Sequence, residues 1–264
     1  MGQIRPEGAT NMSNDLQSLF GDSQASGMSH QAVDLMVQNL DGQTGLGCIG
    51  AQVDDLNTDD VTLIVMVLDE SASMNSVRDD VIDAFNQMTR ALNDSKASDS
   101  ILMSAWTFSN SPKLLFGYTP VDQVKDLSKK DYKPSGATAL YDATLDGLTG
   151  IVAYGQDLRN NGIRTRAIVV LISDGADNVS QRTAHNVKTV ADDLIKQEFY
   201  TLAYIGMGRE ASFKKIADSM GFPEVLTINN TASEVRKALN MVSASIIRTS
   251  TGQINPNQNT FFTP

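Results

Sequence analysis

The sequence has few of the residues on which several common classes of protein rely. Its 264 residues include one cysteine, Cys48, and two histidines, His30 and His185, which excludes an intramolecular disulfide and disfavours a histidine-rich metal centre. No run of about 18 uncharged apolar residues occurs, so no membrane span is predicted. The 21 basic residues are outnumbered by 31 acidic ones, which argues against nucleic acid as the main partner.

The ends of the chain and its composition indicate where the protein resides. No basic stretch leads into an apolar segment near Met1, so no export signal is expected. A lone thiol fits a reducing compartment better than a secreted one, which predicts a cytoplasmic protein. Apolar residues make up 41% of the chain, an ordinary proportion for a globular domain.

Charge divides the chain into regions. Residues 1–60 carry one arginine, no lysine and nine acidic residues, and thus hold most of the net charge of −10. We predict an acidic N-terminal extension rich in Gly, Gln and Ser over residues 1–60, a main domain over 61–248 and a polar tail over 249–264. The composition of the extension is typical of a weakly folded segment.

Two short amphipathic stretches interrupt this extension. They span residues 15–20 and 29–40, the second with apolar residues at helical spacing after a possible cap at Ser29. Such stretches dock a partner, fold back onto the main domain or pair with another copy of the chain. The sequence favours the second or third of these alternatives, because such patterns are common in ordinary packing.

The main domain is predicted to be α/β. Two runs dominated by aliphatic residues, 61–68 and 166–172, lack the alternation of a half-exposed strand and predict central strands covered on both faces. Amphipathic helical segments separate most of the strands, which requires crossovers and a mostly parallel sheet. We therefore expect a doubly wound, Rossmann-like, six-stranded sheet with helices on both faces and one antiparallel edge strand. Its strands are predicted at residues 61–68, 101–108, 113–118, 166–172, 200–205 and 225–228, and its helices at 77–92, 139–158, 183–196, 212–220 and 233–247.

Oxygen-bearing side chains follow the two aliphatic strands. Ligands of doubly wound sheets bind beyond the carboxyl ends of the strands, where Asp69 and Asp174 stand. Ser71 and Ser73 alternate with Asp69 and can turn their oxygens toward one point. Mg²⁺ accepts neutral hydroxyls together with waters that nearby carboxylates hold, so these residues predict a site for a hard cation.

The same residues resemble the metal-ion-dependent adhesion site of the von Willebrand factor type A domain family. That motif is Asp-x-Ser-x-Ser, a Thr in a later loop and an Asp after the next central strand. All of its positions are matched here, by Asp69, Ser71, Ser73, Thr138 and Asp174. The predicted order of strands and helices from residue 61 to 248 also agrees with this family.

The resemblance implies a role for each residue. Ser71 and Ser73 bind the metal directly, Thr138 binds it directly or through water, and Asp69 and Asp174 act mainly through bound water. The metal is Mg²⁺, with Mn²⁺ as the alternative. In the family an acidic side chain of a protein partner often completes the coordination shell, so the cation bridges two proteins.

The family resemblance also suggests a setting. Bacterial members of this kind resemble components of complexes with AAA+ ATPases of the MoxR or chelatase type, or of stress-response and defence systems. We therefore expect an intracellular, prokaryotic-type, non-enzymatic interaction module, with no role in binding nucleic acid or membranes.

Two acidic residues near the motif need separate interpretation. Glu70 occupies a position where the family often has a small or apolar residue, and its charge either strengthens or distorts the site. Asp142 follows Thr138 by one helical turn and is interpreted either as an acid that supports the metal ligands from behind or as a helix-terminus acid, and not as a ligand. An alternative without metal remains: Ser71 and Ser73 cap the following helix, and Asp174 belongs to a turn.

Enzyme functions find little support. The sequence contains no Gly-x-Ser-x-Gly, His-Glu-x-x-His, Gly-x-Gly-x-x-Gly or phosphate-loop motif. His185 is expected on a helix surface, Cys48 is expected to be inert, and Trp106 is expected in the core. Hydrolase activity would need a base near the metal, and RNA binding would need an accompanying RNA-binding domain.

A self-assembling subunit is the remaining alternative function. In that case the metal site only stabilises the fold, and the terminal segments link copies into a homo-oligomer. The tail carries Phe261 and Phe262 after a polar stretch at 253–259, and these aromatics anchor to a partner, anchor to the domain itself or belong to a frayed end.

Overall fold

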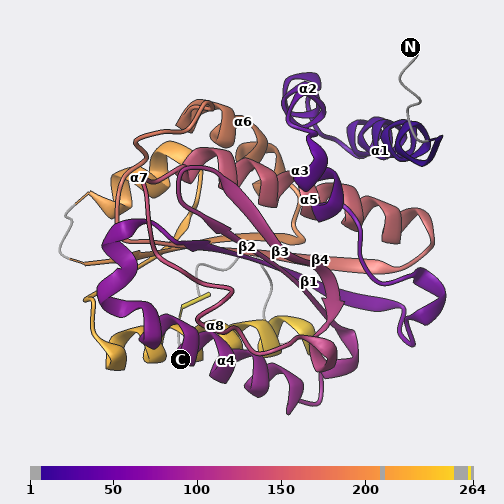
Figure 1. The fold of residues 1–264 in the computed structure, drawn as a ribbon. Coiled ribbons are helices and arrows are strands. Elements are labelled where there is room, and N and C mark those ends of the chain that lie inside the picture. The colour runs from indigo at the N-terminus through magenta and orange to yellow at the C-terminus, as the bar shows by residue number, and fades with distance from the viewer. Residues whose placement is uncertain (1–6, 209–211, 253–260, 263–264) are drawn as a thin grey trace.

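The computed structural model describes residues 7–208, 212–252 and 261–262, with side chains described from residue 16 onward (Figure 1). The polar stretch at 253–259 lies outside these residues. No helix in this described part of the chain combines the length and the apolarity needed to cross a bilayer.

A six-stranded sheet forms the centre of the molecule. Its spatial order is β3-β2-β1-β4-β5-β6, and every neighbouring pair is parallel except β2 and β3. The predicted fold class, mostly parallel with one antiparallel edge strand, is thereby confirmed. The strands are β1 (Asp60–Asp69), β2 (Ile101–Phe108), β3 (Pro112–Pro120), β4 (Arg164–Ser173), β5 (Tyr200–Met207) and β6 (Glu224–Ile228).

Helices cover both faces of the sheet, as Figure 1 shows. One face carries α5 (Leu140–Asn160), α6 (Ala184–Ile195) and α7 (Phe213–Met220). The other carries α4 (Arg78–Asn93) and α8 (Ala232–Ser250). Short 3-10 helices connect the larger elements, and they are η1 (Val53–Asp55), η2 (Ala72–Val77), η3 (Ser98–Ser100) and η4 (Val121–Gln123).

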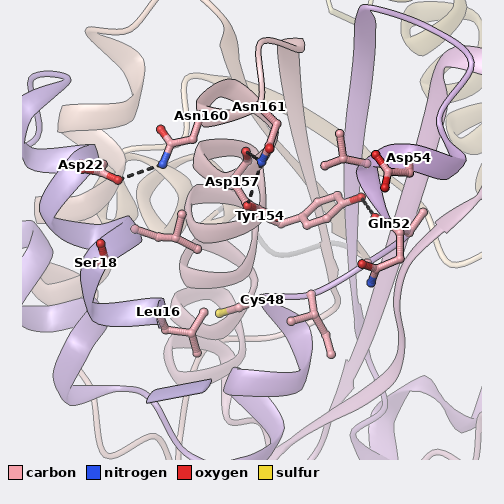
Figure 2. A pocket seen from close by; sticks show the side chains of 15 residues that line it. Leu16, Ser18, Asp22, Cys48, Gln52, Asp54, Tyr154, Asp157, Asn160 and Asn161 are labelled. Atoms are coloured by element: carbon pink, nitrogen blue, oxygen red, sulfur yellow. Dashed lines mark hydrogen bonds between the residues drawn. The ribbon is translucent and has the colours of Figure 1, made fainter. Parts of the chain in front are cut away.

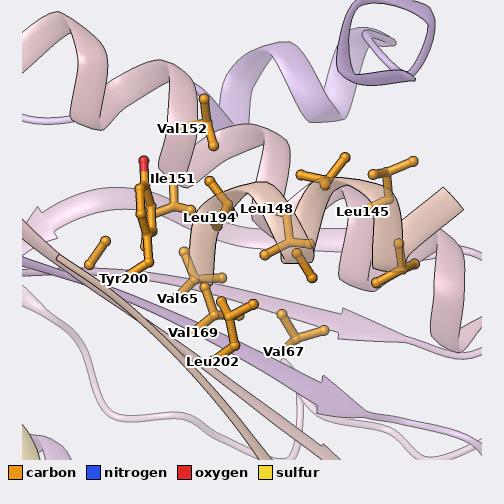
Figure 3. Packing of buried hydrophobic residues seen from close by; sticks show 14 of the residues in the cluster. Val65, Val67, Leu145, Leu148, Ile151, Val152, Val169, Leu194, Tyr200 and Leu202 are labelled. Atoms are coloured by element: carbon orange, nitrogen blue, oxygen red, sulfur yellow. The ribbon is translucent and has the colours of Figure 1, made fainter. Parts of the chain in front are cut away.

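The aliphatic run in β1 supplies both layers of the core. Val65 and Val67 point toward α5, and Ile64, Met66 and Leu68 belong to the layer under α4 and α8. Because successive side chains of a strand point to opposite faces, a strand buried on both faces has no polar positions in its middle. Figure 3 shows the first of these layers, in which helix α5 packs on β1 and β4.

The N-terminal segment is helical and packs against the main domain. It forms α1 (Glu7–Ala25), α2 (His30–Gln38) and α3 (Gly42–Gly47), which contact α5 and α6. Phe20 and Met36 of this segment are fully buried in the same core layer as α5. Composition favoured a weakly folded segment, but the structure shows the alternative in which the amphipathic stretches fold back onto the domain.

Helix α3 was not anticipated, because three of its six residues are glycine. Its start is fixed by Asp41, whose carboxylate accepts hydrogen bonds from the backbone N–H groups of Gln43 (2.8 Å) and Thr44 (2.9 Å). Its end lies against α5, where a Cβ atom on Gly150 would stand 2.6 Å from the carbonyl oxygen of Gly47. Glycine is therefore needed for the close approach of the two helices.

A buried carboxylate joins the N-terminal segment to α5. Asp146 is 6% exposed, and one of its oxygens accepts hydrogen bonds from Asn39 Nδ2 (2.5 Å) and Thr44 Oγ1 (2.9 Å). Burial raises its pKa to about 7, and the nearby charges of Asp41 and Asp142 act in the same direction. Asp146 thus becomes ionised near neutral pH at the contact between α5 and the N-terminal helices.

Replacing Asp146 with asparagine is expected to stabilise the chain at pH 8 by at least about 1 kcal/mol. The pKa of Asp146 in the folded state is about 7 and its ordinary value is 3.8, so the folded state binds the proton more tightly. Asp146 therefore makes the native protein lose stability as the pH rises from about 4 to about 7, with no further change above. Urea unfolding of both proteins at pH 5 and pH 8 measures this. An equal loss of stability in both proteins between these pH values would contradict the assignment.

Phe261 and Phe262 also lie against the domain. Phe261 is 5% exposed and packs into the core layer of α4 and α8, and its carbonyl oxygen accepts a hydrogen bond from Ser245 Oγ in α8. Phe262 stands edge-on to it, with ring centroids 5.1 Å apart. Of the alternatives for these aromatics, the structure shows docking on the chain's own surface.

Candidate metal centre

Three loops meet at the carboxyl edge of the sheet. The first follows β1, the second precedes α5 and the third follows β4. Ser135 N donates to the Glu70 carbonyl oxygen at 2.8 Å, and Ala72 N donates to that of Gly136 at 3.2 Å. Asn178 N, in the third loop, donates to the carbonyl oxygen of Thr138 at 3.0 Å. Backbone hydrogen bonds therefore bring together the loops that carry all five predicted ligands.

The two serines lie in a chain of short contacts that leads to Asp174. The hydroxyl oxygens of Ser71 and Ser73 are 3.0 Å apart, and Ser73 Oγ donates to Asp174 Oδ1 at 2.7 Å. Ser71 is buried, whereas Ser73 is exposed and Asp174 is half-buried. The cluster thus opens to solvent on the side of Ser73 and Asp174.

Asp69 lies beneath this cluster, at the end of β1. It is fully buried, and its Oδ1 accepts a hydrogen bond from Ser71 N at 2.8 Å. Its Oδ2 accepts one from Ser173 Oγ at 2.6 Å, and its carbonyl oxygen accepts one from the Tyr132 hydroxyl. These bonds fix the carboxylate in one orientation behind Ser71.

Sequence reasoning missed the roles of Ser173 and Tyr132. Ser173 immediately precedes Asp174, so its place at the end of β4 was a usable signal. Tyr132 lies in an irregular segment far from the motif, and no sequence pattern assigns it to the site. Both residues act on Asp69 by hydrogen bonding, and neither is a ligand candidate.

Thr138 is held at the site by its backbone. Its N–H donates to Asn178 Oδ1 at 2.9 Å, and the preceding Ala137 N donates to Asn110 Oδ1 at 2.9 Å. Gly136 has φ of +75°, a left-handed conformation that favours glycine. The Thr138 side chain is 5% exposed, and its hydroxyl has no hydrogen-bond partner among the described residues. The Thr138 hydroxyl is therefore available to bind a ligand.

Glu70 does not enter the predicted ligand set. Its carboxylate accepts a hydrogen bond from Lys133 N, and its backbone N donates to the Phe108 carbonyl oxygen at 2.7 Å. The side chain is 7% exposed and turned toward the segment that precedes the second loop. Glu70 thus holds that segment in place, so it supports the site without crowding it.

Asp142 acts as a loop anchor at the start of α5. Its two carboxylate oxygens accept hydrogen bonds from Gln181 N (2.9 Å) and Arg182 N (2.8 Å). In return, Ser180 Oγ accepts hydrogen bonds from the N–H groups of Tyr141 and Asp142, both at 3.1 Å. These reciprocal bonds tie the third loop to the helix that follows Thr138. The interpretation of Asp142 as a helix-terminus acid agrees with this geometry.

The two carboxylates at the site are poorly solvated. Burial raises the pKa of Asp69, and the charge of Asp174 acts in the same direction. Burial also raises the pKa of Asp174, against the hydrogen bond from Ser73. A divalent cation beside them would favour their ionised forms.

The donor set fits a hard divalent cation. Octahedral Mg²⁺ with oxygen ligands at about 2.1 Å separates neighbouring ligand atoms by about 3.0 Å. The Ser71 and Ser73 hydroxyl oxygens already stand 3.0 Å apart, and Thr138 adds a third hydroxyl. Among the described residues, no group of three or more His, Cys, Asp and Glu side chains is arranged to hold a metal. Any cation here would therefore rely on hydroxyl ligands supported by two carboxylates.

The alternative in which the serines only cap a helix does not match the geometry. Ser71 stands at the N-cap of η2 but its side chain makes no capping hydrogen bond, and α4 begins after Val77, also without a side-chain cap. The serine hydroxyls instead face each other and Asp174. Their place in the structure is that of a polar cluster, as the motif predicts.

The other residues with reactive side chains lie elsewhere. His185 is exposed on α6, and His30 contacts Gln24 in the N-terminal segment. Cys48 is buried, and burial raises the pKa of its thiol to about 12, so little of the reactive thiolate is present near neutral pH. Trp106 is fully buried in the core, as expected.

Comparison with known proteins agrees with this description. A sequence model of the von Willebrand factor type A domain matches residues 64–244. No curated protein sequence matches the chain. The PilB minor pilin from Streptococcus sanguinis superposes with a TM-score of 0.52 at 12% identity, over 74% of this chain and 63% of the pilin chain. The pilus adhesin SpaC from Lactobacillus rhamnosus GG, in its open conformation, superposes with a TM-score of 0.56 at 12% identity, over 73% of this chain and 30% of the adhesin. This chain thus spans less than two thirds of either protein, and likeness at this identity shows the fold alone.

Proposed function

Because the chain belongs to the von Willebrand factor type A domain family, a family of protein-interaction modules, we propose that it binds a protein partner through a divalent cation. Ser71, Ser73 and Thr138 would hold the cation, with Asp69 and Asp174 acting through bound water. A cation held there would offer an open coordination position to a carboxylate of the partner. The observation that carries this proposal is the 3.0 Å separation of the two serine hydroxyls beside Asp174.

The exposed side of the cluster sets where the partner would bind. Ser73 is exposed and Asp174 is half-buried, whereas Asp69 and Thr138 lie beneath them. A side chain from another protein can therefore approach from the Ser73 side without displacing the chain. An acidic side chain fits best, because it would complete the coordination shell and offset the cation's charge.

The cation in this proposal is Mg²⁺, with Mn²⁺ as the alternative. Domains of this family commonly bind a divalent metal at this position. Hydroxyl and carboxylate oxygens are hard ligands, which suit both ions. The proposed ligands include no cysteine or histidine, so the site offers none of the ligands that a softer metal ion prefers.

The proposed role is not enzymatic. Of the residues that commonly serve as nucleophile or base, Cys48 is buried with a raised pKa and His185 is exposed on α6. The carboxylates beside the serines are occupied by the hydrogen bonds described above. As a setting, we propose a cytoplasmic complex with an AAA+ ATPase of the MoxR or chelatase type, or a stress or defence system; fold analogy alone supports it.

Self-assembly is a weaker alternative. It rested on the amphipathic N-terminal stretches and the terminal aromatics as links between copies. In the structure Phe20, Met36 and Phe261 are all buried within their own chain. These residues are therefore not available as links unless they first leave the domain.

Removing both serine hydroxyls is expected to weaken Mg²⁺ binding at least tenfold, since each is a direct ligand. The variant is Ser71→Ala with Ser73→Ala, and titration calorimetry measures the affinity for Mg²⁺ and for Mn²⁺. The matched control is Ser76→Ala, an exposed serine of η2. Circular dichroism shows whether the variants remain folded. Equal Mg²⁺ affinity in the folded double variant and in the native protein would contradict the ligand assignment.

Partner capture tests the bridging step. The native protein and the folded double variant are immobilised and exposed to lysate, each with Mg²⁺ and with a chelator. We expect a partner that only the native protein retains and only with Mg²⁺. Retention that is equal in all four conditions would exclude a metal bridge, and a concentration-dependent size without Mg²⁺ dependence would favour self-assembly.

A further inference from the structure

A cavity lies far from the metal centre, between the N-terminal segment and the end of α5. Its walls are α1, residues 48–54 and the C-terminal part of α5, and its volume is about 590 Å³ (Figure 2). Small-molecule sites commonly enclose about 300–1,000 Å³. Asp157, on the cavity wall, is separated from Tyr141, near the metal centre, by about 24 Å along the helix axis. The cavity is therefore a separate site.

The cavity is acidic and contains no basic residue. Asp22 lies on α1, Asp54 on η1 and Asp157 on α5, and none of the residues that line the cavity is Lys, Arg or His. None of the three carboxylates forms an ion pair with another described residue. Two of them accept hydrogen bonds from neutral amides: Asn160 Nδ2 donates to Asp22 at 2.8 Å, and Asn161 Nδ2 donates to Asp157 at 3.3 Å. The cavity thus favours a cation.

The three carboxylates do not converge on one point. No trio of acidic, histidine or cysteine side chains among the described residues is arranged to hold a single metal ion. The carboxylates instead stand on three separate walls, as Figure 2 shows. A ligand that meets more than one of them must carry positive charges separated along its length.

Apolar side chains line the cavity between the three carboxylates. Leu16 and Leu19 of α1 line one wall, and Ile49 and Val53 line the other. Tyr154 completes the wall on α5, and its hydroxyl is fixed by a 2.8 Å hydrogen bond to the carbonyl oxygen of Ala51. The methylene groups of an aliphatic cation match these surfaces.

Two groups in the cavity lack the partners that such a ligand would supply. The Cys48 thiol is only 2% exposed, lines the cavity and makes no hydrogen bond to another described residue. In Figure 2 its sulfur atom is drawn in front of α5. Asp157 is half-buried, and burial raises its pKa with no cation nearby to oppose it. A bound ammonium group would compensate the desolvation of this carboxylate.

We infer that this cavity binds a small aliphatic polyamine, with ammonium groups near Asp157 and at least one of Asp22 and Asp54, and with methylene groups against the leucines of α1. The inference does not depend on the proposed metal bridge. The ligand class follows from separated carboxylates, an apolar lining between them and the lack of any basic residue in the lining.

Titration calorimetry at low salt tests this assignment with spermidine, putrescine and butylamine. We expect spermidine to bind at least tenfold more tightly than butylamine, because only the polyamine reaches several carboxylates. Asp157→Asn is expected to weaken spermidine binding about tenfold, and Asp54→Asn is a second variant on an exposed turn. The matched control, Asp99→Asn, removes the same charge from the exposed residue of η3 and is expected to leave binding unchanged.

A second measurement reads the cavity directly. Because the Cys48 thiol is buried and largely protonated, its reaction with a small thiol reagent is expected to be slow, and spermidine is expected to slow it further in the native protein and not in Asp157→Asn. Absence of spermidine binding, equal binding of butylamine, or equal weakening in Asp157→Asn and Asp99→Asn would overturn the proposal. A lysine tripeptide that binds tenfold more tightly than spermidine would also overturn it, in favour of a basic peptide segment. The Ser71→Ala, Ser73→Ala variant should bind spermidine normally, which separates this proposal from the metal bridge.

Discussion

A valine in place of Gly150 is expected to destabilise the folded chain by about 3 kcal/mol. Gly150 lies where α5 meets α3, and a Cβ atom on it would stand 2.6 Å from the carbonyl oxygen of Gly47. Gly47 cannot retreat, because a Cβ atom on it would stand 2.2 Å from the ring of Trp106 in the core. The added side chain therefore fits only if α3 is displaced together with the Trp106 ring against which Gly47 lies. Urea unfolding followed by circular dichroism measures the loss.

The matched control places the same substitution in an open position. Gly21 lies in α1, and a Cβ atom there would meet no atom within 4 Å. Valine at Gly21 is expected to change the free energy of unfolding by less than about 0.5 kcal/mol, since valine is no worse than glycine in a helix. Comparable losses from the two valines would show that α3 does not pack on α5 as described.

Truncating Phe20 to alanine is expected to lower the free energy of unfolding by about 3–4 kcal/mol. The ring is fully buried in the core layer of α5, although Phe20 belongs to the acidic N-terminal extension. If α1 folds together with the domain, the whole unfolding transition shifts to lower urea. The fluorescence of Trp106, the only tryptophan, follows that transition from inside the core.

Leu46 provides the comparison for this substitution. It lies on α3 in the same N-terminal segment, but its side chain is 49% exposed. Leu46→Ala is expected to cost less than about 1 kcal/mol, because little apolar surface leaves a buried site. A Phe20→Ala variant that unfolds at the native urea concentration would show that α1 folds independently of the domain. The boundary predicted at residue 60 would then also mark a boundary in folding.

The main sheet was predictable because its strands are buried on both faces. The runs at 61–68 and 166–172 lie within β1 and β4, and the ends differ by one to two residues. The turn at 109–112 correctly indicated the antiparallel edge strand, since β3 begins at Pro112. A strand that is buried on both faces needs apolar residues at successive positions. The local sequence and the tertiary packing therefore indicate the same structure for these segments.

The N-terminal helices were only partly predictable. The stretch at 29–40 contains α2, with Ser29 as its cap, because its apolar spacing and its capping residue are local signals. Helix α3 has neither apolar spacing nor helix-favouring composition. Gly47 and Gly150 allow the backbones of α3 and α5 to pack closely. Such a tertiary contact produces no hydrophobic periodicity in either segment, so the sequence does not predict it.

The candidate site was also only partly predictable from the sequence. Asp69, Ser71 and Ser73 lie close together in sequence, and their motif predicted a cluster that the structure shows together with Asp174. The supporting hydrogen bonds from Ser173, and from distant segments such as that of Tyr132, depend on how loops cross at the sheet edge. The fold determines which loops meet at this edge, and the local sequence pattern does not predict it.

Burial of β1 on both faces bears on how sequences of this fold diverge. A strand surrounded by aliphatic side chains is constrained in volume and shape, and aliphatic residues exchange for one another there at small cost when neighbours repack. The chain and the streptococcal pilin share only 12% of their residues over the aligned region, yet they share the fold. Two chains can therefore keep this fold while most of their aligned residues differ, and exchanges within such a core must conserve its total volume.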